Sequence, residues 1–413
     1  MVPNGWERKP LEKVAEIRTG VAKGKKGLKD PIEVPYLRVA NVQDGHIDLS
    51  EVKTIKIERH QLERYSLQVG DVLMTEGGDF DKLGRGDVWQ GQITPCLNQN
   101  HVFAVRPNNQ ILLPYFLAAL SGSNYGKTYF LSCAKRSTNL ASINSTQLKE
   151  FPVLLPPLPE QRKIAKTLST WDKAIATTEK LIETSKQQKK ALMQQLLTGK
   201  KRLVNPETGK AFEGEWEEAT IASLFNISTG KSKSKFISEE GKFLIVDMGS
   251  ISREGKLIAS KKTSHEGDFL SLGQLVMPKD DIGGGQIIGR TAYIPENGQF
   301  VLSDHVYLLT PKSVNSLFAT YLINSWGINK QLRSKANGTA QLGLGKKDVE
   351  KQKLVVPTLL QEQQKIASVL TAADKEIEVL EDKLAHFKQE KKALMQQLLT
   401  GKRRVKVDEM EAA

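Results

Sequence analysis

Two stretches of the chain place apolar residues three and four positions apart in alternation, which is the pattern of a helix with one apolar seam. They lie within 160–198 and 362–400, and neither contains Gly or Pro. Seven of ten seam positions are apolar in the first stretch and nine of ten in the second. This spacing predicts two long helices that pair as a coiled coil. The seam positions are Ile164, Leu168, Trp171, Ile175, Thr178, Ile182, Ser185, Lys189, Leu192 and Leu196, then Ile366, Leu370, Ala373, Ile377, Leu380, Leu384, Phe387, Lys391, Leu394 and Leu398.

The same two stretches repeat their sequence at an offset of 202 residues. They open with EQRKIAKTL and EQQKIASVL, and the repeat continues two residues past each stretch to the end of the dodecapeptide KKALMQQLLTGK, at 189–200 and 391–402. The chain therefore contains an internal repeat. Each predicted helix has about 38 residues and a length of roughly 57 Å.

The direction of the pair follows from the segment between the helices. A domain made from about 150 residues is shorter than such a helix, so a parallel pair would force it to bridge the whole coil. An antiparallel pair lets both ends of that domain lie beside neighbouring helix ends. We therefore expect an antiparallel coiled coil, and the alternative is that each helix packs separately on its own domain.

The segments before the helices also resemble each other. Landmarks recur in the same order, such as PYLRVANVQDGHID with KFLIVDMGSISREGKL and NHVFAVRP with DHVYLLTP. Alternating β-branched runs, glycine-rich turns and a short helical stretch predict an α+β domain in each half. The differences gather in loops rich in Gly, Asn, Lys and Arg, so the two halves share a scaffold and differ where a ligand would be read.

Composition points to a polyanionic partner. The chain carries 60 Lys and Arg against 47 Asp and Glu, a formal charge of +13. This excess favours nucleic acid, although a generally basic protein would look similar. With two cysteines, Cys96 and Cys133, no leader-like segment and no run of about 18 apolar residues, we expect a cytoplasmic protein without a membrane partner.

The chain has no intact catalytic motif. GTAQLGLGKK at 338–347 lacks the Gly-Lys-Ser/Thr ending of a phosphate-binding loop, and GGGQIIG at 283–289 does not fit a dinucleotide fingerprint. Asp247 with Glu254 and Lys256 imitates a nuclease carboxylate set, which is a common chance match. His101 and His305 occupy matching strand-like positions, where we expect them to support a core rather than bind metal. We expect no enzyme activity, no metal and no cofactor.

The order of globular domain, long helix, globular domain and long helix, with EQxKIA openings and ALMQQLLTGK endings, resembles the specificity subunit of type I restriction–modification systems. The resemblance covers essentially the whole chain. It implies target recognition domains at 1–157 and 201–358, conserved helices at 158–200 and 359–404, and a tail at 405–413. It also implies that each recognition domain reads one half of a bipartite, asymmetric site in double-stranded DNA.

In that family the coil sets the spacer between half-sites and docks two methyltransferase subunits, with endonuclease subunits in the full complex. Adenine methylation and cleavage would then belong to those partners. The alternative is a coiled-coil adaptor that binds other proteins through two related domains.

The divergent loops supply candidate DNA contacts. Short lysine-rich loops would bind phosphates, although a solvated basic loop looks the same, and Arg, Lys, Asn or Gln on mobile loops would meet base edges. The phosphate candidates are Lys23, Lys25, Lys26, Lys231, Lys233 and Lys235. The base-edge candidates are Lys82, Arg85, Arg136, Asn139, Gln286, Arg290, Asn337 and Gln341.

The repeated dodecapeptide supplies candidate docking residues. A seam demands only apolar character, yet Lys189, Gln194, Gln195 and Lys200 recur at the same offset. Two equivalent sites for two copies of one partner would keep exposed residues identical, whereas a recent duplication would have kept the globular halves similar too. The docking candidates are Leu192, Met193, Gln194, Gln195, Leu394, Met395, Gln396 and Gln397.

Overall fold

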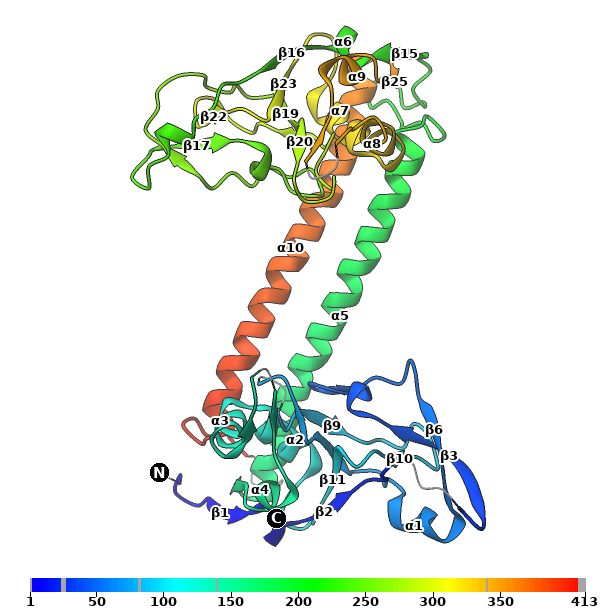
Figure 1. Ribbon diagram of the computed structural model, residues 1–413, viewed down its shortest axis with the longest axis vertical. Helices are drawn as coiled ribbons and strands as arrows, with labels where there is room; N and C mark the ends of the chain where they lie inside the picture. The colour runs from blue at the N-terminus through cyan, green and yellow to red at the C-terminus, as the bar shows by residue number, and fades with distance from the viewer. Residues whose placement is uncertain (1, 24–26, 81–82, 139, 339–340, 408–413) are drawn as a thin grey trace. The chain divides into compact units, whose positions relative to one another are not determined.

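The chain divides into two compact units, and each unit contains one globular half together with parts of both long helices (Figure 1). The first unit runs up to Lys180 and resumes at Asp382, and the second spans Leu181–Glu381. The computed structural model describes residues 2–23, 27–80, 83–138, 140–338 and 341–407. None of the helices in these ranges is both long and apolar enough to cross a membrane.

The centre of the first unit is a four-stranded antiparallel sheet in the order β2-β11-β7-β9. Every residue of β7 is buried, because the sheet is covered on both faces. Val72 and Met74 face one apolar cluster and Leu73 faces another. The strands are β2 (Ala15–Thr19), β7 (Val72–Thr75), β9 (Gly86–Val88) and β11 (Val102–Pro107).

One covering layer is helical, and the other is a second sheet. Phe116 and Leu120 of α2 (Pro114–Gly122) and Phe130 of α3 (Asn124–Cys133) share the cluster of Met74. On the other face lie β3 (Pro31–Leu37), β6 (Lys53–Glu58) and β10 (Leu97–Asn98), with β3 antiparallel to β6 and parallel to β10. The unit is therefore an α+β fold, as the sequence predicts.

Shorter elements complete the first unit. Two of them, β1 and β14, pair as an antiparallel ribbon, and β12, β13 and β8 form a small sheet. These elements are β1 (Glu7–Pro10), β4 (Val42–Gln43), β5 (His46–Ile47), β8 (Gly77–Gly78), β12 (Lys135–Arg136), β13 (Ala141–Ser142), β14 (Pro152–Leu155), η1 (Leu11–Lys13), η2 (Val39–Asn41), η3 (Arg59–Gln61), α1 (Leu62–Tyr65) and α4 (Ser145–Lys149).

The second unit repeats this topology. Its four-stranded sheet has the order β16-β23-β19-β21, and its second sheet has β17 antiparallel to β18 and parallel to β22. The elements are β15 (Trp216–Thr220), α6 (Ile221–Leu224), β16 (Phe225–Thr229), η4 (Ser234–Phe236), β17 (Phe243–Val246), η5 (Met248–Ser250), β18 (Lys262–Thr263), β19 (Leu275–Pro278), β20 (Asp280–Asp281), β21 (Ala292–Tyr293), β22 (Phe300–Leu302), β23 (Val306–Pro311), α7 (Ser316–Asn324), α8 (Trp326–Arg333), β24 (Leu342–Gly343), α9 (Lys346–Glu350) and β25 (Lys353–Pro357). The predicted relation between the globular halves is confirmed.

The two predicted long helices are α5 (Leu158–Leu196) and α10 (Leu360–Leu398), each of 39 residues. In the first unit Lys391 pairs with Asp172, and Lys388 lies 2.7 Å from Glu179. Residues further along α5 therefore pair with residues earlier in α10. The second unit contains the equivalent pairs at the 202-residue offset: Lys189 with Asp374 at 2.6 Å, and Lys186 with Glu381 at 2.7 Å. The antiparallel pairing is confirmed within each unit.

The predicted seam is confirmed position by position. All twenty seam residues are buried or half-buried, including the polar Thr178 and Ser185. In the first unit the rings of Trp171 and Phe387 meet edge to face with centroids 5.5 Å apart. A seam of this kind lets apolar side chains of one helix fill the spaces of the other.

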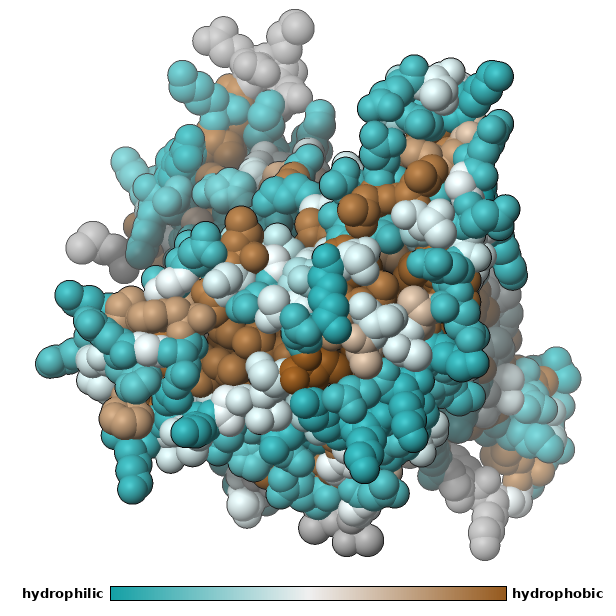
Figure 2. All heavy atoms as spheres, turned by 90° about the horizontal axis from the view of Figure 1, so that it is seen from above, coloured by the Kyte–Doolittle hydropathy of each residue, from teal (hydrophilic) through white to brown (hydrophobic). Residues whose placement is uncertain are grey.

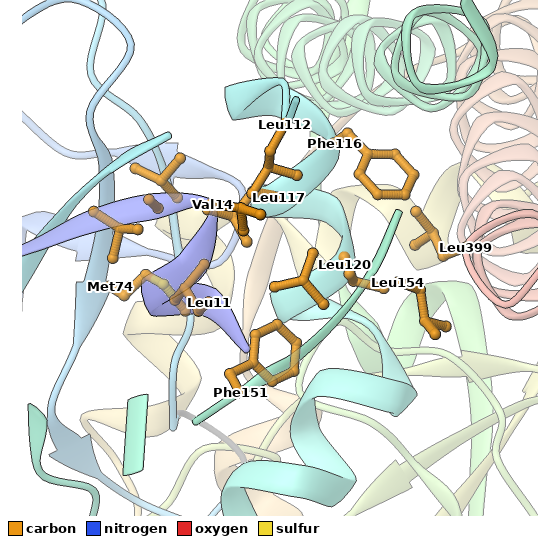
Figure 3. Packing of buried hydrophobic residues seen from close by; sticks show 14 of the residues in the cluster. Leu11, Val14, Met74, Leu112, Phe116, Leu117, Leu120, Phe151, Leu154 and Leu399 are labelled. Carbon is orange, nitrogen blue, oxygen red and sulfur yellow. The ribbon is translucent and has the colours of Figure 1, made fainter. Parts of the chain in front are cut away.

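The helix ends complete the globular cores. In the first unit Ile164 and Leu168 of α5 join the core with Leu398 of α10 and Leu399 beyond its end. Figure 3 shows Leu399 directed toward the ring of Phe116 in this core. The second unit uses Leu196 and Leu197 with Ile366, Ala367 and Leu370 in the same way. The paired leucines of the dodecapeptide therefore recur because each copy fills a core.

The EQxKIA opening has a structural explanation as well. Buried Gln161 accepts a hydrogen bond from the backbone N–H of Leu113 at 2.9 Å and donates to the carbonyl of Ile111 at 2.8 Å. Gln363 accepts equivalently from Asn315 N–H at 2.8 Å, just before α7. Gln161 thus ties the start of α5 to the loop before α2, and Gln363 ties the start of α10 to the loop before α7.

The glutamate of the opening forms an ion pair with an arginine that follows the other long helix. Glu362 is fully buried and accepts two hydrogen bonds from Arg202, at 2.6 and 2.7 Å. In the first unit Arg404 pairs with Glu160, which also accepts from the indole N–H of Trp6 at 3.3 Å. These pairs fix the end of one helix against the start of the other.

We expect the two ion pairs to differ in their contribution to stability. Arg202→Met leaves a fully buried carboxylate without its partner, so the free energy of unfolding of the second unit should fall by about 3 kcal/mol. Arg404→Met should cost the first unit about 1.5 kcal/mol, because 42% of the Arg404 side chain is exposed and Trp6 still donates to Glu160. Urea unfolding of both variants measures the difference, and equal losses would contradict it.

Candidate nucleic-acid interface

The divergent loops of each globular half come together at a small sheet. In the first unit β8 pairs with β13, and β13 pairs with β12, so the divergent segment that begins after Gly78 is joined to the one that carries Arg136. In the second unit β20 pairs with β24, so the divergent segment that begins after Asp281 is joined to the one that ends before Leu342. The two small sheets therefore join the segments that carry the described base-edge candidates, and Lys82 and Asn139 fall outside the described residues.

The described candidates differ in exposure. Arg136 is exposed on β12 and donates to the carbonyl of Leu131 at 2.7 Å. Gln286 and Gln341 are exposed, as is Asn337, whose backbone exchanges hydrogen bonds with Gly343. Because their side chains face solvent, these four residues remain free to meet a base edge.

Two candidate arginines are held more tightly. Arg85 and Arg290 are half-buried, and the Nε atom of each is buried without a hydrogen-bond partner. Nη1 of Arg290 donates to the carbonyl of Asn324 at 2.6 Å. Burial lowers the pKa of Arg290, and the neighbouring charge of Arg333 lowers it further.

The lysine-rich loops divide into exposed and buried members. Lys23 is exposed and lies 5.9 Å from the centre of the Tyr36 ring, whereas Lys25 and Lys26 fall outside the described residues. Lys231 and Lys235 are exposed as well.

Lys233 differs from these neighbours. It is only 3% exposed, and its amine lies 2.7 Å from Asp268. The hydrogen bond from this amine holds the pKa of Asp268 below its usual value. The lysine spacing in the sequence could not reveal that one of the three points inward, and we do not retain Lys233 as a phosphate contact.

The two histidines are not core residues, contrary to the expectation from sequence. The side chain of His101 is 55% exposed and that of His305 is 44% exposed. Nδ1 of His101 lies 2.5 Å from Glu76, and Nδ1 of His305 lies 2.6 Å from Asp280. His101 directly precedes β11, and His305 directly precedes β23. Each histidine therefore stands at the end of a strand, beside the divergent loops of its unit. In the described residues, groups of three or more potential metal ligands are absent.

The docking candidates also separate into two kinds. Leu192, Met193, Leu394 and Met395 are half-buried and pack on the cores of their units, whereas Gln194, Gln195, Gln396 and Gln397 are exposed. Lys189 and Lys391, whose recurrence suggested docking, form ion pairs inside the coil with Asp374 and Asp172. Their recurrence is therefore explained by pairing within the chain.

Each copy of the dodecapeptide lines a groove beside a short helix, which is α3 in the first unit and α8 in the second. In the second unit Met193 and Gln194 face Trp326 and Gly327 at the start of α8, across a groove of about 820 Å³. In the first unit Met395 and Gln396 face Asn124 and Tyr125 of α3 across a groove of about 620 Å³. Trp326 is 77% exposed. Figure 2 shows hydrophobic residues lying between hydrophilic ones on the face that it draws.

Comparisons with known proteins agree with this arrangement. A family model described as the type I restriction modification DNA specificity domain matches twice, over residues 3–187 and 213–389. Two proteins of Methanocaldococcus jannaschii are similar along most of their length. One is described as the putative type I restriction enzyme MjaX specificity subunit, with 30% identity over 98% of this chain and 95% of that protein. The other, the MjaVIII specificity subunit, is 29% identical over 90% and 86%.

Solved structures support the fold. The S subunit of a type I restriction–modification system from M. genitalium aligns with a TM-score of 0.60 and 15% identity over 96% of this chain and 97% of that one. A chain from a structure of type I R-M complex assembly aligns with a TM-score of 0.57 and 17% identity, over 98% and 100%.

We expect the three lysines of the second unit to respond differently to replacement by Gln. Lys231→Gln and Lys235→Gln should each weaken binding to any DNA sequence and lower the slope of log K against log salt by about 0.9. Lys233→Gln should leave that slope unchanged but lower the free energy of unfolding by about 1.5 kcal/mol, because it removes a buried charged hydrogen bond. Salt titrations and urea unfolding on the three single variants test this, and a lower slope for Lys233→Gln would contradict it.

Proposed function

Because the chain belongs to the family of type I restriction–modification specificity subunits, we propose that each of its units reads one half of a bipartite, asymmetric site in double-stranded DNA. The observation that carries this proposal is the same fold twice in one chain, with the sequence differences gathered where two loops meet at a small sheet. Because the two units share a fold but differ in their loops, they are suited to read two half-sites of different sequence.

The proposed contacts fall into two groups. Lys23, Lys231 and Lys235 bind phosphates, together with Lys25 and Lys26. Arg, Asn and Gln side chains of the loops contact base edges, for which Arg136, Gln286, Asn337 and Gln341 are exposed. Lys82 and Asn139 remain candidates from sequence. Phosphate contacts position a protein on DNA, and base contacts select the sequence.

We further propose that the two grooves along the dodecapeptides each dock one methyltransferase subunit, through which endonuclease subunits join. The equivalent exposed glutamines Gln194 and Gln396 each border one groove, so two copies of one partner would meet the same side chain. Methyl transfer and cleavage then belong to these partners, and the chain itself acts without a cofactor. The setting of such a complex is the cytoplasm, where chromosomal DNA is accessible.

Replacing the glutamines tests the docking proposal. Gln194→Lys and Gln396→Lys each add a charge that an apolar partner surface would have to desolvate. Each single variant should therefore bind one methyltransferase subunit instead of two, and the double variant none. Native mass spectrometry of the reconstituted complex gives the stoichiometry. Gln188→Lys, an exposed position six residues before Gln194 on α5, is the matched control.

The same preparation tests the catalytic proposal. The chain alone should transfer no methyl group from S-adenosylmethionine to DNA, and activity should appear when methyltransferase subunits are added. An unchanged two-to-one stoichiometry in the double variant, or methyl transfer by the chain alone, would contradict these proposals.

The spacer between half-sites tests the proposed role of the coil. Four residues inserted in both helices, by duplicating Leu181–Thr184 in α5 and Glu378–Glu381 in α10, add about 6 Å as one helical turn each. Since DNA rises about 3.4 Å per base pair, the methylated motif should gain one or two spacer base pairs and keep both half-sites. Mapping of methylated adenines in cells reads the motif.

An insertion in α5 alone is the control, because it breaks the seam and should abolish methylation. A paired insertion that leaves the spacer unchanged would show that the coil is not the ruler. A motif with altered half-site bases would show that the loops do not act independently of it.

A further inference from the structure

One short segment is equivalent in the two units although the loops around it differ. It reads LGRG at 83–86 and IGRT at 288–291. The N–H of Gly84 donates to the carbonyl of Thr75, the last residue of β7, at 3.2 Å. The N–H of Gly289 donates to Pro278, the last residue of β19, at 3.4 Å. Arg85 and Arg290 therefore occupy the same place in the fold.

The glycine explains how each arginine is positioned. Gly84 and Gly289 have φ values of +63° and +66°, in the left-handed region that glycine favours. A Cβ at Gly84 would collide with the ring of Phe130 in α3, and one at Gly289 would lie 2.8 Å from Cβ of Leu332 in α8. Each loop thus lies directly on a core helix at this point, and the next residue is held against the rigid part of the unit.

The arginines lack the internal acceptors that usually accompany burial. The Arg85 guanidinium has no hydrogen bond or ion pair with the described residues, and the Arg290 guanidinium has the single bond from Nη1 to the Asn324 carbonyl. Buried guanidinium groups are ordinarily bonded on several sides, so an orphaned Nε in both copies needs an explanation. An external anion would supply the missing acceptors.

The surroundings of Arg290 are suited to an anion. It lines a pocket of about 350 Å³ together with Lys330 and Arg333, and no Asp or Glu belongs to the lining. Gly284 and Gly285 form part of the wall, where the absence of side chains leaves room for a ligand. Burial lowers the pKa of Arg290 and the positive charge of Arg333 lowers it further, whereas the charge of Glu254 opposes this effect. A concave cluster of cations attracts a phosphate.

The same arginine occurs in two units that would read different half-sites. We therefore expect it to contact a part of the DNA that is the same in both half-sites. Base edges differ between the half-sites, while the phosphodiester backbone is the same. We propose that Arg85 and Arg290 are equivalent phosphate-binding residues that position each unit on the DNA backbone, rather than the base readers that their loop position suggests. This inference rests on the proposed function of the chain.

The test uses the complex with methyltransferase subunits and two duplexes, one with the methylated motif and one with both half-sites scrambled. Arg85→Gln and Arg290→Gln should each weaken binding to both duplexes by the same factor, about tenfold to a hundredfold. Each should also lower the salt slope by about 0.9, and the methylated motif should stay as it is. Lys13→Gln and Lys351→Gln, which remove one exposed charge from each unit, should change the slope much less.

The outcomes separate this inference from the broader function. If Arg85→Gln relaxes the choice of base at one position and leaves binding to the scrambled duplex unchanged, the arginine is a base reader and the inference is wrong, although the chain still reads DNA. Unchanged affinity for both duplexes would also overturn it. Should a Gln variant fail to fold, Arg85→Lys and Arg290→Lys retain the charge and should keep most of the salt slope while losing affinity equally on both duplexes.

Discussion

The fold depends on the way in which the ends of the two long helices complete the globular cores. The first unit needs Leu398 and Leu399 from the end of α10, and the second needs Leu196 and Leu197 from the end of α5. Burial of a leucine side chain contributes about 1.5–3 kcal/mol, so each unit would lose much of its stability without the helix that arrives from the other repeat. The buried ion pairs of Glu160 and Glu362 hold these ends in place. The divergent loops and the grooves along the dodecapeptides are then built on a frame that neither half of the sequence makes alone.

Much of this frame could be predicted from sequence because it follows from periodic patterns. Heptad spacing identified the seam, and the 202-residue offset revealed the repeat and the kinship of the globular halves. The antiparallel direction followed from chain length. Side-chain roles within a motif were harder to predict, since Lys189 recurs for its ion pair with Asp374 while Gln194 recurs on the surface. In the sequence, a residue that recurs for an ion pair cannot be told from one that recurs on the surface.

The candidate interface was predictable only in outline. Loop divergence located the surface, but the direction of single side chains depends on contacts with distant segments. Lys233 points inward because its amine donates a hydrogen bond to the carboxylate of Asp268, 35 residues later in the chain. His101 and His305 are exposed because they stand at the end of a strand rather than within it. The Gly-Arg segment was hidden among differing loop letters, and its equivalence became visible only through the hydrogen bonds to β7 and β19.

The two long helices also have a fixed register. Sliding α10 along α5 by one heptad, about 10.5 Å, would part Lys391 from Asp172 and also Lys189 from Asp374. It would withdraw Leu398 from the core of the first unit and displace Ile366 in the core of the second. Coiled coils with plain leucine seams can shift by a heptad at little cost. In this chain a shift by one heptad would break contacts within each of the two units, so the register is fixed twice.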